Sequence, residues 1–152
     1  DSSLGVGLLL AFTLFMGLML SISLSAALQF RNGGTLIAMA AGGTGVIFFS
    51  LATLATVTKR DFSFMGKFLF IGLIMLVVAS IANIFFAMPA LSLTISAIAV
   101  MLFSAYILYD VSNIVNGGET NYVIATLQIY LDVYNLFVNL LNLLMAFSGE
   151  RD

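Results

Sequence analysis

The chain has 152 residues, of which 62% are hydrophobic and 8% are charged, whereas about a quarter of the residues in soluble domains are charged. This composition excludes a soluble globular protein and predicts a membrane protein. The net charge is −2 and only five residues are basic, so no basic patch is available and nucleic acid is excluded as a partner. Cysteine and histidine are both absent, which excludes disulfides, thiolate or imidazole metal ligands, and thiol or imidazole catalysis.

Charged and turn-forming residues divide the chain into five apolar runs. A bilayer is crossed by a helix of about 20 apolar residues, and a membrane strand would need alternation over about ten, which these runs lack. We expect helices at about 4–28, 35–58, 65–88, 89–115 and 120–147. The only proline, Pro89, divides the third helix from the fourth. The predicted fold is an all-α polytopic transmembrane bundle, a single domain over residues 1–152, with the lipid bilayer as its surroundings. The chain opens with DSSLGVG, so we expect no signal peptide.

Small residues recur on three of the expected helices. Such residues let helices approach closely in lipid, so we expect these three helices to be tightly packed neighbours. The small residues are Gly17, Ser21 and Ser25 on the first helix, the stretch 35–45 on the second, and Ser92 and Ser96 on the fourth.

Basic residues in short loops predict the orientation, because they favour the cytoplasmic side. Lys59, Arg60 and Lys67 share one loop, whereas Arg31 and Arg151 lie on the opposite side. We therefore expect a cytoplasmic N-terminus and an external C-terminus.

Asp110 and Asp132 are the only charged residues inside the apolar runs. A carboxylate at membrane depth costs a few kcal/mol even on permissive scales, so it tends to face a bundle interior, a watery cavity or a partner. The turn NGGETN (116–121) makes the last two helices antiparallel neighbours. Counted from that turn, Asp110 is about 9 Å deep and Asp132 about 17 Å deep. Contact between them therefore requires helix tilt, a bend or a bridging water.

The last helix carries a polar stripe, and Asn113 lies one turn after Asp110. Spacings of 4, 3, 4 and 3 place the stripe on one helix face, so it lines either an interior path or a seam of hydrogen bonds between helices. The stripe consists of Gln128, Asp132, Asn135, Asn139 and Asn142.

A meeting of the two aspartates would create a site for protons or cations. Mutual repulsion and desolvation favour a protonated carboxyl in such a pair, which is the basis of a pH sensor. Deprotonated carboxylates with amide oxygens from Asn113 or Asn135 would supply the hard oxygen ligands that calcium prefers. The alternative is that both carboxylates are structural.

The sequence predicts no enzymatic activity and no resident cofactor. Without histidine or cysteine there is no Ser/His/Asp or Cys/His arrangement, and GGTG (42–45) has no lysine beside it for a phosphate loop. Intramembrane aspartyl proteases also use two aspartates, but a GxGD motif is not found around Asp110 or Asp132.

Two segments, RDFSFMGKFLFIGLIMLVVASIANIFFAMPALSLTISA (60–97) and YILYDVSNIVNGGETNYVIATLQIYLDVYNLFVNLLNLL (106–144), resemble the Bax inhibitor-1 (transmembrane Bax inhibitor motif) family. The resemblance is strongest to its bacterial YccA-like branch, which modulates the FtsH protease. It implies a seven-helix bundle in the bacterial cytoplasmic membrane with a central last helix, of which this chain matches helices three to seven.

In calcium-leak members of the family, aspartates on the sixth and seventh helices form a pH-sensitive pair that gates a pore, and Asp110 and Asp132 match those positions. Those members also use a basic residue on the second helix, which this chain does not contain, and the protease-modulator branch varies at the second carboxylate. The first hypothesis is a pH-sensitive calcium or cation leak or sensor. The alternatives are a regulator that binds and inhibits a membrane-embedded AAA protease of the FtsH type, and a scaffold without transport.

Overall fold

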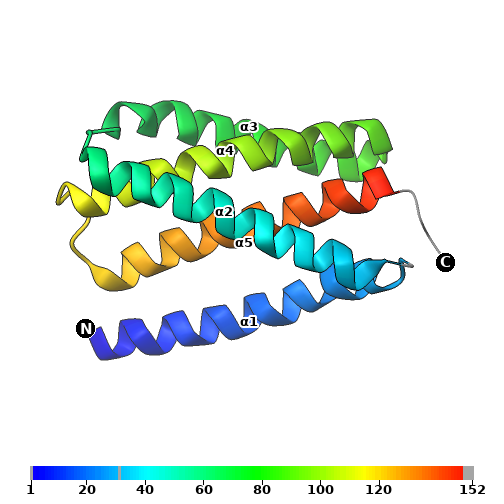
Figure 1. Cartoon of the computed structure of the whole chain (residues 1–152), viewed down its shortest axis with the longest axis horizontal. Helices are drawn as coiled ribbons and strands as arrows, with labels where there is room; N and C mark the ends of the chain where they lie inside the picture. Colours follow the sequence, from blue (N-terminus) through cyan, green and yellow to red (C-terminus); the bar gives the residue numbers. More distant parts are fainter. Residues whose placement is uncertain (1, 31, 149–152) are drawn as a thin grey trace.

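The computed structural model describes residues 2–30 and 32–148 and consists of five long α-helices (Figure 1). They are α1 (Ser2–Leu28), α2 (Gly33–Thr58), α3 (Gly66–Phe86), α4 (Pro89–Val115) and α5 (Tyr122–Ser148), with a short 3₁₀ helix η1 (Ser63–Met65) before α3. Each α-helix is long and apolar enough to cross a membrane. The predicted all-α polytopic bundle is therefore confirmed. Arg31 and Arg151, which entered the orientation prediction, lie outside the described residues.

Local backbone chemistry explains where the helices end. Lys59 ends α2 in the left-handed conformation with φ of 52°, and its N–H donates to the carbonyl oxygen of Ala55. Pro89 occupies the first turn of α4, where a missing N–H costs no helical hydrogen bond. Asn121 precedes α5, and its Oδ1 accepts hydrogen bonds from the backbone N–H groups of Val123 at 3.0 Å and Ile124 at 3.4 Å. These contacts satisfy two of the donors that a helix start leaves unpaired.

Helix α5 lies between several neighbours in the bundle. Its most extensive interface is with α4, to which it runs antiparallel, and it also packs against α2 and α1 (Figure 1). Helix α3 packs against α4 and η1, but in the described part of the chain it does not pack against α5. This arrangement leaves a space between α3 and α5, with α4 as its floor.

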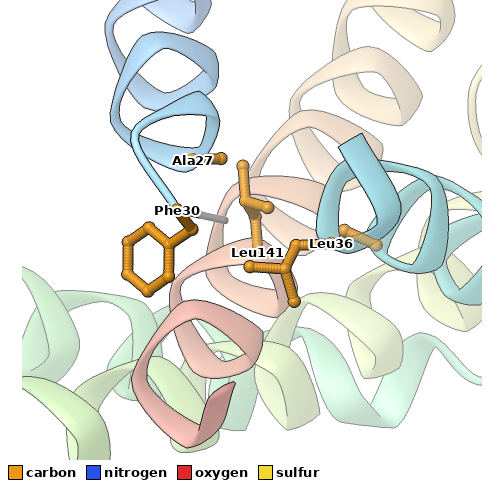
Figure 2. Close-up of a cluster of buried hydrophobic side chains, with 5 residues drawn as sticks. Ala27, Phe30, Leu36 and Leu141 are labelled. Atoms are coloured by element: carbon orange, nitrogen blue, oxygen red, sulfur yellow. The ribbon is translucent and has the colours of Figure 1, made fainter. Parts of the chain in front are cut away.

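Two hydrophobic clusters hold these helices together. The first joins the α1–α2 turn to the end of α5 through Ala27, Phe30, Leu36, Ala40 and Leu141 (Figure 2). Small alanine side chains at two of these positions permit the close approach of α1 and α2 to α5.

The second cluster joins α4 to the middle of α5. Its buried members are Ala99, Phe103, Ile107 and Leu136, and side chains from α2 and α3 pack around them. This cluster fixes the two helices that carry the aspartates.

The expected packing of small residues is correct for α2 but wrong for α1. On α2, the side chains of Ala40 and Thr44 are buried within the predicted stretch. On α1, Gly17, Ser21 and Ser25 are all exposed, and a Cβ atom added at Gly17 would meet nothing within 4 Å. In addition, α1 does not pack against α4 in the described residues. Four-residue spacing marks a helix face, but it does not say whether a neighbour covers that face.

The loop between α2 and α3 is attached to the end of α4 by a group of hydrogen bonds. Ser112, which is 1% exposed, donates from Oγ to the carbonyl oxygen of Arg60 at 2.8 Å and accepts from the N–H of Phe62 at 3.3 Å. Asn116 donates from Nδ2 to the same Arg60 oxygen at 3.1 Å. The basic loop is thereby attached to α4 at Ser112, which is two residues after Asp110 in the sequence.

Candidate functional site

Helices α4 and α5 bring the two intramembrane aspartates together. Asp110 and Asp132 are each 5% exposed, and their carboxyl groups lie within hydrogen-bonding reach of each other. The difference in depth expected from the sequence does not prevent this contact. The structure thus provides the juxtaposition on which the predicted ion or proton site depends.

The pair is buried without a basic partner. Neither Lys nor Arg is among the described residues that line the space around the two carboxyl groups. Asp132 Oδ2 is buried and, within the described chain, accepts no hydrogen bond. A hydrogen bond between two carboxyl groups requires a proton on one of them, because a carboxylate can only accept. The arrangement is therefore compatible with one shared proton and unfavourable for two bare charges.

The pair lies in a partly open cavity of about 650 Å³ between α3, α4 and α5. The wall from α3 is apolar except for Ser80, whereas α5 contributes the polar stripe. The polar residues of α5 that line this cavity are Gln128, Asp132, Asn135 and Asn139. Four of the five members of the predicted stripe therefore share one cavity with Asp110.

The amides of the stripe do not form a ladder between helices in the described residues. Asn135 donates from Nδ2 to the carbonyl oxygen of Leu131 at 2.9 Å, and Asn139 donates from Nδ2 to the carbonyl oxygen of Asn135 at 2.8 Å. Both donors are thus used within α5. The side-chain oxygens of these amides remain available to water or a cation in the cavity.

Two of the predicted supporting residues lie elsewhere. Asn113 is in the last turn of α4, where its carbonyl oxygen accepts hydrogen bonds from the N–H groups of Gly118 at 2.7 Å and Glu119 at 3.2 Å. It is not among the residues lining the cavity, because one further helical turn carries it past Asp110 toward the end of α4. Asn142 lines a separate cavity at the other end of α5.

Two tyrosines belong to the cavity and were not predicted as site residues. Tyr106 and Tyr109 both line it, and Tyr106 is close enough to interact electrostatically with both aspartates. Tyr109 reaches its position because Gly66 leaves room, since a Cβ atom at Gly66 would be 2.6 Å from the tyrosine hydroxyl. Tyr106 could have been predicted as a site residue, because it lies one helical turn before Asp110. The role of Gly66 depends on a contact that the sequence does not reveal.

The cavity offers a small set of hard oxygen donors. The described residues contain no group of three or more Asp, Glu, His or Cys that could hold a metal. Calcium takes six to eight oxygen ligands, and the cavity offers two carboxyl groups and the nearby amide oxygens. Water would have to supply the remaining ligands of a calcium ion held there.

These features define a multi-pass membrane protein with an acidic pair inside its helix bundle. A family model described as "Inhibitor of apoptosis-promoting Bax1" matches residues 1–149, so the chain belongs to the Bax inhibitor-1 family. This finding confirms the family expected from the sequence.

Several curated bacterial proteins are similar to the chain. "Modulator of FtsH protease YccA" of Escherichia coli K12 is 43% identical over 134 residues, which are 88% of this chain and 61% of that protein. An "Uncharacterized membrane protein" of Vibrio cholerae is 43% identical over 144 residues, 95% of this chain and 65% of that protein. An uncharacterized protein of Campylobacter jejuni is 45% identical over 150 residues, 99% of this chain and 65% of that protein. The chain thus spans less than two thirds of the length of these relatives.

Proposed function

We propose that this protein senses protons and passes a cation, with calcium as the expected cargo, through the cavity that contains Asp110 and Asp132. The observation that carries the proposal is the contact of two buried carboxyl groups in a cavity with no basic residue among its described lining. A structural role alone gives no reason to leave Asp132 Oδ2 buried and unpaired, because an unsatisfied buried polar atom costs about 1–3 kcal/mol.

The proposed switch is electrostatic. With one proton on the pair, the O–H of one carboxyl group donates to the other and joins α4 to α5. When that proton is lost, two unit charges about 4 Å apart repel by about 4 kcal/mol at an effective dielectric constant of 20. This repulsion exceeds what one hydrogen bond between membrane helices contributes, about 0.6–2 kcal/mol. Deprotonation therefore favours separation of the carboxyl groups and attracts a divalent cation into the cavity.

Few other groups can influence this titration. Tyr106 and Tyr109, both from α4, are the other titratable side chains among the residues that line the cavity. The wall from α3 contributes none, and α2 carries no charged residue before Lys59. We therefore assign the change of charge in this proposal to the two aspartates.

Flux in liposomes tests this proposal. We expect calcium flux through the purified protein to rise between about pH 6 and pH 8, and to lose this dependence in Asp132→Asn and Asp110→Asn. Glu119→Gln is the matched control, because it makes the same chemical change in the turn outside the cavity. Equal flux in the wild type and Asp132→Asn across this range contradicts the leak mechanism.

A second function is favoured by the 43% identity to the relative named as a modulator of FtsH protease. We propose that this protein also binds a membrane-embedded AAA protease of the FtsH type and slows degradation of its membrane substrates. A partner cannot contact a carboxylate inside the bundle, so the exposed loops and the lipid-facing surface would carry the interaction. We expect the double variant Asp110→Asn, Asp132→Asn to lose flux but to retain inhibition.

Co-purification with the protease and the degradation rate of a membrane substrate test this second function. A double variant that binds normally but no longer slows degradation would show that the two roles are linked. For location we propose the bacterial cytoplasmic membrane, since one relative is named "Inner membrane protein YccA". The C-terminus is proposed to be external, on the basis of Lys59 and Arg60 in the loop between α2 and α3 and of Lys67 in the first turn of α3.

A further inference from the structure

A second cavity, also of about 650 Å³, lies at the opposite end of α5. The end of α1, the start of α4 and the end of α5 form its walls, at the end of the bundle where the α1–α2 turn is found (Figure 1). Phe30, which belongs to the cluster in Figure 2, contributes to its lining. The polar members of the lining are Gln29, Ser92, Ser96 and Asn142.

The polar side chains of this cavity have no hydrogen-bond partner within the described residues. This holds for Gln29, Ser92, Ser96 and Asn142, although Ser96 is only 5% exposed. In the described chain, Asp132 Oδ2 is the one fully enclosed side-chain atom that lacks a hydrogen bond, and no atom of these four side chains belongs to that class. Gln29 and Ser92 are exposed, whereas Ser96 and Asn142 are not exposed but retain accessible polar atoms beside the cavity that they line. Unpaired amides and hydroxyls at membrane depth are favourable only where water or another polar ligand satisfies them.

The two cavities follow each other along the same faces of α4 and α5. On α4, Ala99 lines the first cavity and Ser96 lines the second. On α5, Asn139 lines the first and Asn142 the second. The step on α5 is three residues, or about 5 Å along the helix. On α4 the two linings meet, because Ile95 of the first cavity lies beside Ser96 of the second in the sequence.

We infer that the second cavity is a water-filled vestibule on the opposite side of the membrane, and that a thin layer of side chains, about one helical turn deep on α5, separates it from the cavity of the aspartates. On α5 this barrier lies between Asn139 and Asn142, and on α4 it consists of the adjacent side chains of Ile95 and Ser96. The neutral oxygen atoms of the vestibule suit a hydrated cation. Its role in conduction depends on the proposed function, whereas its accessibility to water does not.

The absence of cysteine permits a direct test by single cysteine substitutions. Ser96→Cys and Asn142→Cys are exposed to a charged, membrane-impermeant thiol reagent, in intact spheroplasts and in inverted membrane vesicles. Ser21→Cys is the matched control, because Ser21 lies seven residues from the end of α1 as Ser96 lies seven residues from the start of α4, yet Ser21 is on an exposed face of α1.

We expect both vestibule cysteines to react from the membrane face that carries the α1–α2 turn, and at least about tenfold faster than Ser21→Cys, since a thiol in apolar surroundings rarely ionises. Asn139→Cys should react from the other face only. Vestibule cysteines as slow as Ser21→Cys overturn the inference, and so does equal labelling of Ser96→Cys and Asn139→Cys from one face. If Ser96→Cys does not fold, Gln29→Cys at the mouth of the cavity gives the same reading.

Flux after labelling separates this inference from the proposed function. Reagent attached to Ser96→Cys should reduce calcium flux at least about tenfold, as expected when a bulky charged group fills a narrow passage. Fast labelling with unchanged flux shows that the vestibule is outside the path and overturns that part of the inference. Fast labelling combined with wild-type flux in Asp132→Asn contradicts the aspartate switch but supports the vestibule.

Discussion

Replacing Ser112 by alanine should release the loop between α2 and α3 from the end of α4. The Ser112 hydroxyl donates to the carbonyl oxygen of Arg60 at 2.8 Å and accepts from the N–H of Phe62 at 3.3 Å. In Ser112→Ala the Arg60 oxygen keeps its hydrogen bond from Asn116, but the N–H of Phe62 loses its partner. One half-buried donor left unsatisfied costs about 1–2 kcal/mol of unfolding free energy.

Ser104→Ala is the matched control on the same helix. The Ser104 hydroxyl donates at 2.6 Å to the carbonyl oxygen of Val100 within α4, so its removal should change the unfolding free energy by less than about 0.5 kcal/mol. Equilibrium unfolding in mixed micelles with increasing dodecyl sulfate measures both variants, and amide hydrogen exchange reports on the N–H of Phe62. Equal destabilisation by the two substitutions, or unchanged exchange at Phe62 in Ser112→Ala, would refute the reasoning.

Three further outcomes follow from the structure. Gly33→Ala should destabilise the fold by about 1–3 kcal/mol, because its Cβ would overlap the backbone of Ala27, whereas Gly34→Ala, with nothing within 4 Å, should be neutral or stabilising in the same unfolding assay. A cysteine at Thr120 should be protected from an impermeant thiol reagent in intact cells and one at Gly34 labelled; the reverse pattern would invert the predicted orientation. Lys59→Gly should raise the unfolding free energy by about 1 kcal/mol, since a left-handed non-glycine residue, here with φ of 52°, is disfavoured by roughly that amount; a loss of stability would contradict this.

The local features of the sequence were enough to predict the helices, and the resemblance of two segments to known sequences predicted the family. Apolar length, charged breaks and the single proline act within one or two helical turns, so five membrane-spanning helices could be expected without any knowledge of packing. The polar face of α5 was also predictable, because helical periodicity alone places Gln128, Asp132, Asn135 and Asn139 on one side.

The candidate site itself is a product of tertiary packing. The sequence suggested a depth difference between Asp110 and Asp132, and only the way in which α4 packs on α5 brings the two carboxyl groups into contact. The cavity around them exists because α3 packs on α4 and not on α5, and no local pattern in the apolar sequence of α3 encodes that choice. Similarly, the exposed small residues of α1 and the position of Asn113 outside the cavity depend on which neighbour covers each helix face. Periodicity determines which residues share a face, but the surroundings of that face depend on contacts between distant parts of the chain.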